Sequence, residues 1–360
     1  MSKLDVDVER DLLRKRTPAL AMAVCHRGQI ILERAWGLAD LAAGTVADAA
    51  HVFQACSVTK MFTATAVVQL AARNQLRLDE PLDRYLRGKG TGWSGITARH
   101  LLCHHAGLKD RFRTAPTLQP GMSPPTAFEM IDPSLRPSPR PAGHGAYANV
   151  HYSALWWLVE EVAGISLADY VSREILEPAG LHDIAYGYPE RFIPRAAKGH
   201  VGAFFEFPLL RMLGGRAASD LVGRRVGGLV VLRPYVPAEW GAGGIVGTAS
   251  ALARFGALHL GFPTRVAEEI LDREWADAMR QPIGRIHLGP VAITCGLGWW
   301  LKVDGEDVFA EHWGRAPGFT AALRILPQRQ ISIALLLNRL QLDPRPWDHI
   351  MRLAVASACS

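Results

Sequence analysis

Apolar residues at the start of the chain follow first the spacing of a helix and then that of two strands. Residues 1–16 set leucines and a valine three or four positions apart among charged residues, which predicts an amphipathic helix. Two mainly apolar runs follow at 19–24 and 29–37, and the polar turn at 26–28 separates them. Apolar runs joined by such a turn predict an antiparallel hairpin.

Helical periodicity dominates the middle of the chain. Apolar side chains recur every three or four positions over residues 56–74, which predicts a buried helix beginning near Ser57. The ranges 150–163, 167–177 and 248–260 show the same spacing and are also predicted to be helices. The glycine-rich run at 240–244 fits no nucleotide-binding motif, and we interpret it as a turn before the last of these helices.

Two stretches of the middle do not follow either period. Eight prolines make residues 116–141 a long irregular connection, which we expect to form a loop along a surface or the rim of a cleft. Residues 201–237 are apolar and basic, and the pattern leaves open whether they form a substrate-facing lid or a packed insertion. If the stretch forms a lid, its aromatic side chains would shelter a reaction intermediate from water. These side chains are Phe204, Phe205 and Phe207, together with the nearby Trp240.

The last third of the chain returns to strands, followed by a closing helix at 346–356. The strands are expected at 297–303, 308–311, 320–326 and 331–338. Strands at both ends with helices between them predict an α/β (α+β) fold, in which the two termini build one antiparallel sheet flanked by helices. We expect residues 1–55 and 290–360 to form the sheet region and 56–289 a mainly helical region, with insertions near 116–141 and 201–237 and the active site between the regions.

Composition excludes several classes of protein. The chain has 360 residues, 49% hydrophobic and 21% charged, which is the composition of a folded globular protein. The net charge of +6 comes from 33 arginines and only 7 lysines, but no basic run is interleaved with aromatic residues, so nucleic acid is not an expected partner. No apolar stretch is long enough to span a bilayer, and residues 1–16 lack the apolar core of a secretion signal, which predicts a cytoplasmic protein.

Cysteine and histidine usage does not require a metal or a disulfide. Five cysteines are odd in number and never form a C-x-x-C pair, which favours reduced, buried thiols. His100, Cys103, His104 and His105 offer metal-ligand atoms within two turns, but no second ligand pair follows at matching spacing. We therefore interpret this run as a helix that packs its leucines and ends at Gly107, and we expect no cofactor.

Ser57 and Lys60 form the strongest local signal for chemistry. Residues three apart lie on one face of a helix, so the spacing brings a hydroxyl beside an amine. Serine needs a base to become a nucleophile, and a lysine serves as one when burial or nearby positive charge lowers its pKa. The bare S-x-x-K pattern is also compatible with a helix-capping serine and a solvated lysine.

Two further short motifs follow in the chain. Tyr147 and Asn149 lie two residues apart just before a predicted helix, so that a phenol and an amide can face one cleft. The run 312–315, His-Trp-Gly-Arg, lies between predicted strands, where a glycine lets a substrate approach backbone N–H groups able to stabilise an oxyanion.

These motifs, in this order, resemble the serine β-lactamase and penicillin-binding-protein superfamily, in particular its branch of class C β-lactamases, D-alanyl-D-alanine carboxypeptidases, family VIII esterases and related transacylases. The resemblance covers most of the chain and extends to the runs ITARHLLCHHAGL, ILEPAGLHD and AGGIVGTASALARF. It is poor over 116–141 and 201–237, where we expect specificity to reside.

The resemblance implies acyl transfer through a covalent ester of Ser57, with Lys60 and Tyr147 sharing the proton transfers. Asn149 would hold the acyl part of the substrate or orient Lys60, and His312 would lie beside the bound carboxylate, the leaving group or Tyr147. The resemblance further assigns the oxyanion hole to the backbone N–H groups of Ser57 and Arg315, and substrate contact to Trp313 and Gly314.

Several functions are compatible with these motifs. The third motif carries His312 where most β-lactamases carry lysine, which favours an esterase or acyltransferase of intracellular metabolism over a β-lactam specialist. Its partners would be a small ester or amide substrate and, for a transacylase, an amine or alcohol acceptor. A β-lactamase or D-amino-acid peptidase is the alternative enzyme, and a catalytically silent binding scaffold is an alternative of another class.

Overall fold

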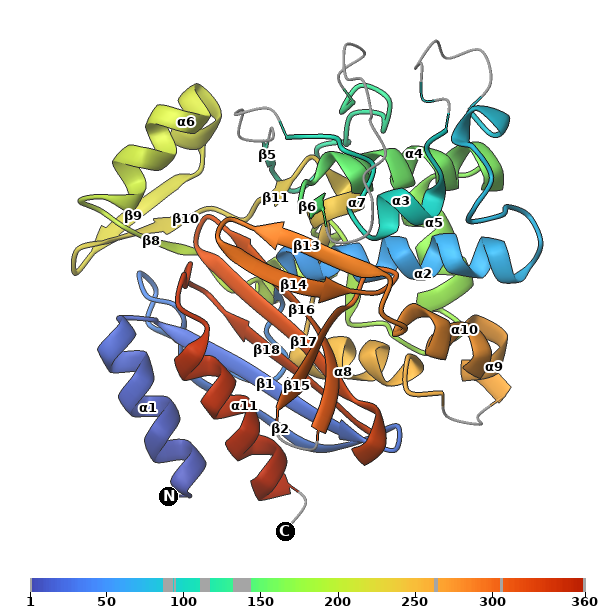
Figure 1. Ribbon diagram of the computed structural model, residues 1–360. Coiled ribbons are helices and arrows are strands. Elements are labelled where there is room, and N and C mark those ends of the chain that lie inside the picture. The colour runs from blue at the N-terminus through green and yellow to red at the C-terminus, as the bar shows by residue number, and fades with distance from the viewer. Residues whose placement is uncertain are drawn as a thin grey trace.

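One large sheet, built from both ends of the chain, forms the centre of the fold (Figure 1). The computed structural model describes residues 2–86, 93, 95–110, 117–131, 144–261, 265–304 and 307–358. Within these residues the sheet has ten strands in the order β3-β2-β1-β18-β17-β16-β15-β14-β13-β6. All neighbours are antiparallel except β13 and β6. The predicted fold class is therefore confirmed.

The strands of this sheet come mainly from the first 46 and the last 77 residues. They are β1 (Ala19–His26), β2 (Gln29–Asp40), β3 (Thr45–Val46), β6 (Gly145–Ala146), β13 (Gly284–Leu288), β14 (Val291–Cys295), β15 (Trp300–Asp304), β16 (Asp307–Ala316), β17 (Phe319–Leu326) and β18 (Ile331–Leu337). Two of them, β6 and β13, come from residues that the sequence pattern assigns to the helical region, so the sheet takes strands from that range as well.

Strand β1 explains why the apolar run at its position shows no alternation. All of its residues except His26 are buried, and alternate side chains enter two different cores. Leu20, Met22 and Val24 pack on the side of the terminal helices, whereas Ala21 and Ala23 pack on the opposite side. A strand covered on both faces reads as a continuous apolar run, because neither face meets water.

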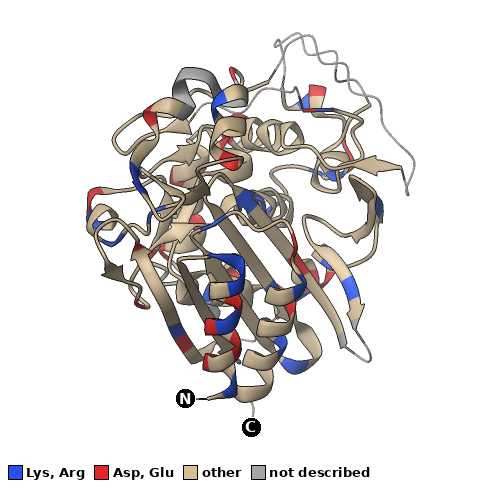
Figure 2. Cartoon of the chain, turned by 90° about the vertical axis from the view of Figure 1, so that its left-hand side faces the viewer, with Lys and Arg blue, Asp and Glu red and all other residues tan. Residues whose placement is uncertain are grey.

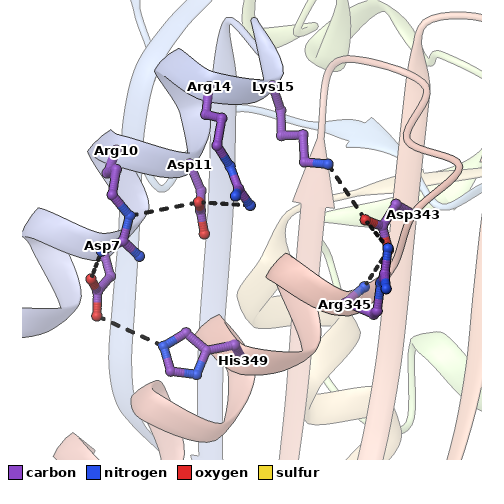
Figure 3. Close-up of polar contacts among 8 residues, drawn as sticks. All are labelled: Asp7, Arg10, Asp11, Arg14, Lys15, Asp343, Arg345 and His349. Carbon is purple, nitrogen blue, oxygen red and sulfur yellow. Dashed lines mark hydrogen bonds and ion pairs between the residues drawn. The ribbon is translucent and has the colours of Figure 1, made fainter.

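Helices α1 (Lys3–Lys15) and α11 (Arg345–Ala358) lie side by side and cover one face of the sheet (Figures 1 and 3). Leu4, Val8 and Leu12 of α1 share a buried cluster with Trp347 and Ile350 of α11. Ionic contacts border this cluster: Lys15 Nζ lies 3.5 Å from Asp343, and His349 Nε2 lies 3.9 Å from Asp7. The two ends of the chain therefore close one core together.

The other face of the sheet is covered by α8 (Ala249–Leu258) and the helical region. Helix α2 (Thr59–Ala72) is buried almost all round, which marks it as the centre of that region. The remaining helices are α3 (Ala98–Leu102), α4 (Val150–Ala163), α5 (Leu167–Val171), which continues into a π-helical turn at Ser172–Leu176, α7 (Trp240–Gly243), α9 (Arg265–Ile270) and α10 (Arg273–Met279). Short 3-10 turns span Cys56–Val58, Leu82–Arg84, Glu190–Arg195 and Pro327–Arg329.

Some predicted elements differ from the structure. The run at 240–244 forms the one-turn helix α7 rather than a turn, and the strand β12 (Ile245–Gly247) after it pairs with β4 (Phe53–Gln54) and β7 (Ile184–Tyr186). Helix propensity does not predict this turn, because residues 241, 243 and 244 are glycines. The helix predicted to end at Gly107 ends at Leu102, because His104 takes a left-handed conformation with φ of 59°.

The stretch 201–237 forms a small unit of its own beside the large sheet (Figure 1). A three-stranded sheet is formed by β8 (His200–Gly202), β10 (Leu229–Leu232) and β9 (Val222–Val226), and α6 (Glu206–Asp220) lies between β8 and β9 in the chain. The last strand of the stretch, β11 (Val236–Pro237), pairs with β5 (Thr117–Leu118). Phe204 and Phe205 are 90% and 75% exposed, so these two side chains do not shelter a site, contrary to the lid interpretation. Of the loop predicted at 116–141, residues 117–131 are described and hold only the short strand β5 beside turns and irregular backbone, while 116 and 132–141 lie outside the described residues.

Charged residues are interspersed on the outer helices. On the face turned to the viewer in Figure 2, basic and acidic segments alternate and do not gather into one basic band. None of the helices in the described ranges combines the length and the apolar character needed to cross a membrane.

A buried ion network on β16 provides a test of the core. Glu311 is fully buried and accepts two hydrogen bonds from Arg324, at 3.0 and 2.6 Å, while Lys302 lies 2.5 Å away. Arg324→Met would leave a buried carboxylate without its main partner, and we expect it to lower the free energy of unfolding by about 3–5 kcal/mol. Lys302→Met, at a half-exposed position, should cost less than about 1 kcal/mol. Urea unfolding of both variants checks this, and equal losses would contradict it.

Candidate active site

Ser57 lies where a 3-10 turn, Cys56–Val58, runs into α2. It is partly exposed, whereas its neighbours Cys56 and Val58 are buried, so its hydroxyl is the accessible group of the turn. Cys56 has a φ of 49°, a left-handed conformation that side chains other than glycine rarely adopt. Such local strain is typical of residues that aim a functional side chain.

Lys60, in the first turn of α2, is fully buried three residues after Ser57. Its Nζ contacts Ser57 Oγ at 3.2 Å, Asn149 Oδ1 at 2.7 Å and the carbonyl oxygen of Ala242 at 3.3 Å. The ring of Tyr147 lies 5.0 Å from the same nitrogen. None of the ion pairs among the described residues joins this amine to a carboxylate, so its partners are all uncharged. The solvated-lysine interpretation is therefore wrong.

Asn149 reaches Lys60 because the start of α4 is fixed by another residue. The carboxylate of Asp110 accepts hydrogen bonds from the backbone N–H groups of Asn149 and Val150, both at 2.9 Å. These are donors that the first turn of a helix leaves unsatisfied, and a carboxylate there is further favoured by the helix dipole. Asp110 thus holds the helix end from which the Asn149 side chain extends to Lys60.

Tyr147 lies near Lys60 and the rings of three other side chains. Its ring is tilted against His104 at 4.6 Å and lies 6.0 Å from Trp300 and 6.4 Å from His312, measured between ring centroids. No hydrogen bond in the described part of the chain joins its hydroxyl to Ser57 or Lys60. The direct contact to the serine is therefore made by Lys60, and Tyr147 flanks the pair.

The run 312–315 lies on strand β16 and not between strands, which corrects the predicted boundaries. The strand runs on to Ala316 because residues 312–316 pair in continuous register with β17. The small volume of Gly314 is needed there, since a Cβ atom would lie 2.6 Å from the backbone nitrogen of Ser57 and 2.7 Å from Ala55 O. The glycine therefore brings β16 into direct contact with the turn that carries Ser57.

The other three residues of the run differ in how they are held. His312 is fully buried, and no hydrogen-bond partner within the described ranges meets either of its ring nitrogens. Trp313 is buried in the apolar cluster against which Tyr147 packs. The guanidinium of Arg315 donates to the carbonyl oxygens of Gln341 and Leu342, at 2.9 and 3.2 Å, which ties its side chain to the segment before α11.

A pair of buried histidines supports the turn that carries Tyr147. The N–H of Ala148 points at His104 Nδ1 at 3.4 Å, and His151 Nδ1 lies 3.1 Å from the same atom and 3.2 Å from Ala148 O. His104 Nδ1 is therefore the acceptor, and His151 Nδ1 carries the proton and donates to both. The pair therefore fixes the backbone between Tyr147 and Asn149.

The histidines around Lys60 are neutral at physiological pH. Burial, and then the charge of Lys60, lower the pKa of His312 to about 3. Burial likewise lowers the pKa of His151 to about 3, and burial together with His151 and Lys60 holds the pKa of His104 well below its usual range. None of these rings therefore adds a positive charge to the surroundings of Lys60 near pH 7.

The histidine and cysteine run at 100–105 does not assemble into a metal site. His100 contacts its own helix cap at Thr97, His104 faces His151, and His105 Nδ1 lies 2.7 Å from Cys103 O. Over the described residues, no group of three or more His, Cys, Asp or Glu side chains is arranged to hold a metal ion.

Three residues of the site were missed by the sequence pattern: Asp110, Glu239 and Ala242. Ala242 contributes only a backbone carbonyl, which carries no sequence signal. Asp110 caps a helix that begins 40 residues later, so no local spacing reveals it. Glu239, three residues before Ala242, is half-buried, and burial, and then the Asp110 carboxylate, raise the pKa of its carboxyl group to about 7.

A family model described as Beta-lactamase matches residues 6–356. The chain belongs to the beta-lactamase family. Members of this family are serine hydrolases, among them esterases, amidases and peptidases. The match spans the sheet, the helical region and every residue of the site described above.

Individual relatives have different activities. D-aminopeptidase of Brucella ovis (strain ATCC 25840 / 63/290 / NCTC 10512) is 32% identical over 170 residues, which are 46% of this chain and 32% of that protein. Esterase EstB of Burkholderia gladioli is 30% identical over 208 residues, 53% of each chain. The chain thus spans a third to a half of the length of these relatives.

The solved structure of D-amino acid amidase from Ochrobactrum anthropi SV3 complexed with D-phenylalanine has the same fold. It aligns with a TM-score of 0.80 at 22% sequence identity, and the alignment covers 99% of this chain and 100% of the amidase.

Gly314 offers a test of the packing between β16 and Ser57 in this family member. Gly314→Ala must push the strand away from the Ser57 turn, and we expect a loss of about 1–3 kcal/mol in the free energy of unfolding together with slower labelling of Ser57 by a fluorophosphonate. Gly202→Ala is the matched control, because its Cβ would meet only the flexible side chain of Glu206. Labelling rates that do not differ between the two variants would contradict the prediction.

Proposed function

We propose that this protein is a serine acyl-enzyme hydrolase that opens ester or amide bonds of small molecules through Ser57. The observation that carries the proposal is the contact of 3.2 Å between Ser57 Oγ and Lys60 Nζ, in a buried setting where the other partners of the amine are uncharged oxygen atoms. A serine beside an amine of this kind is the arrangement that nucleophilic catalysis requires.

In the first half of the proposed reaction, Ser57 Oγ attacks the carbonyl carbon of the substrate. Lys60 accepts the hydroxyl proton, and the backbone N–H groups of Ser57 and Arg315 stabilise the oxyanion. The bond from the carbonyl carbon to the alcohol oxygen or amine nitrogen then breaks. The leaving group takes the proton by way of Lys60 and Tyr147, and the acyl group remains on Ser57 as an ester.

In the second half, water attacks the ester carbon and gives up a proton to the same groups, so that the acid leaves and the Ser57 hydroxyl is restored. Asn149 supports both halves by holding Lys60 Nζ at 2.7 Å. Trp313 and Gly314 belong to the strand against which the substrate would lie, with His312 beneath Tyr147. No cofactor takes part in these steps.

Loss of the nucleophile is the direct test. Ser57→Ala should lower turnover of an activated ester such as p-nitrophenyl acetate by more than about 1,000-fold and abolish the covalent adduct that mass spectrometry finds on the wild-type protein. Ser166→Ala, which removes the surface cap of α5, should keep the adduct. Full turnover by Ser57→Ala would refute the role of Ser57, and a wild-type protein that forms no adduct would support the silent binding scaffold.

Hydrolysis and transfer are distinguished by the fate of the acyl group. We expect the acid to dominate the products, because the exposed Phe204 and Phe205 leave the proposed acyl-enzyme without the apolar cover that transfer requires. The ratio of acid to transferred product, measured over a series of amine and alcohol concentrations, checks this. A product dominated by transfer at low acceptor concentration would establish an acyltransferase instead.

A D-aminopeptidase-like activity is the second candidate. It is favoured by the 32% identity to the Brucella ovis D-aminopeptidase over almost half of this chain. It uses the same acyl-enzyme steps, with an amine as the leaving group.

A further inference from the structure

Four large apolar side chains are exposed together at the start of α6. Leu209 and Met212, three residues apart on one face of the helix, are 39% and 73% exposed. The cap residue Phe205, 75% exposed, lies one turn before Leu209, and Phe204 before it is 90% exposed. Single exposed apolar residues are common, but a group of large ones marks a surface that binds another molecule. We call these four residues the apolar stripe.

Two arginines border the stripe at a cavity between α6 and β9. The cavity has a volume of about 430 Å³, and Arg211 and Met212 of α6 line it together with Arg225 of β9. The guanidinium carbon of Arg225 lies 5.7 Å from the centre of the Phe207 ring, which lines the same cavity. The cavity therefore combines an apolar wall with two cationic residues.

A third arginine borders the stripe at the tip of the β9–β10 hairpin. The guanidinium of Arg16 donates to the carbonyl oxygen of Gly227 at 3.0 Å. A Cβ atom on Gly228 would lie 3.4 Å from this guanidinium and 3.8 Å from the ring of Phe204. A cation and the most exposed side chain of the stripe thus meet at the same point of the hairpin.

The charge of these three arginines is not neutralised within the described part of the chain. None of the ion pairs there joins Arg16, Arg211 or Arg225 to an acidic side chain. The acidic residue next to the stripe, Glu206, is itself occupied, because it lies 3.1 Å from Arg339 and accepts from the N–H of Gly202 at 2.7 Å. The stripe is therefore bordered by positive charge that is open to an anionic partner.

This combination of groups favours a membrane surface as the partner. Apolar side chains that enter the interface, with arginines at the level of the headgroups, are the arrangement by which amphipathic helices bind bilayers. A second copy of the chain fits less well, since a two-fold interface would place the same arginines against one another. Helix α6 also stands at the outer edge of the molecule, where a flat surface can reach it (Figure 1).

We propose that the apolar stripe and the three arginines bind the surface of a bilayer that contains anionic lipids. The apolar side chains enter the interfacial region, and the guanidinium groups contact the phosphates of the headgroups. Arg211 and Arg225 offer two cations to one headgroup at the cavity that they line. This binding does not depend on the chemistry of Ser57 and goes beyond the proposed function.

The test measures binding of the full chain to vesicles by co-sedimentation. One set of vesicles consists of phosphatidylcholine, and the other of equal parts of phosphatidylcholine and phosphatidylglycerol. We expect a partition coefficient at least about tenfold larger for the anionic vesicles, and a decrease of this preference as salt is added, because ions screen the attraction between arginine and lipid phosphate.

Variants separate the apolar contribution from the cationic one. Phe204→Ser/Phe205→Ser should lower the partition coefficient on anionic vesicles at least about tenfold, whereas Val303→Ser, at a position of β15 that is 72% exposed, should not change it. Arg225→Gln should lower it about fivefold, and Arg77→Gln, which removes the same charge elsewhere on the surface, should leave it unchanged. Thermal unfolding checks that each variant is folded.

Three results would overturn the inference. The first is equal binding to the two kinds of vesicle, or binding to neither. The second is binding to anionic vesicles that Phe204→Ser/Phe205→Ser does not weaken. The third comes from analytical ultracentrifugation without lipid: a dimer that dissociates in this double variant would show that a second copy of the chain covers the stripe.

Discussion

The hydrogen bonds of one buried amine, Lys60 Nζ, hold the candidate active site together. They join three segments that are far apart in the chain, because Asn149 lies 89 residues and Ala242 182 residues after Lys60. A buried donor without a partner costs about 1–3 kcal/mol, so the starts of α4 and α7 must lie where their oxygen atoms meet this nitrogen. Tyr147, two residues before Asn149, is consequently held with its ring 5.0 Å from the same amine.

A second constraint comes from the sheet, which supplies the opposite side of the site. Strand β16 approaches the Ser57 turn so closely that only a residue without a side chain fits at position 314. Two neutral histidines, His104 and His151, hold the turn that carries Tyr147 from the other direction. The imidazoles around Lys60 are uncharged, and the Asp110 carboxylate holds the start of α4 from the segment that follows α3.

The elements that follow from the sequence are those with a strong local period. The terminal helix, the β1–β2 hairpin and the strands before the closing helix bury one or two faces along their whole length, so their apolar spacing is regular. The stretch 201–237 could not be assigned, because exposed apolar side chains at 204, 205, 209 and 212 break the pattern around α6, while strand β10 is buried along its whole length. Helix α7 was likewise not predicted, because its glycines have low helix propensity and tertiary contacts hold it instead.

For the site, the sequence by itself predicted that Ser57 and Lys60 lie together, because side chains three residues apart in helical backbone share a face. The motifs around Tyr147 and Gly314 pointed to a family and therefore to a fold. Only the tertiary structure decided which groups surround Lys60 and that Asp110 caps α4. The physical reason is that local spacing encodes which face of an element is buried, whereas contacts between distant segments depend on how whole elements pack.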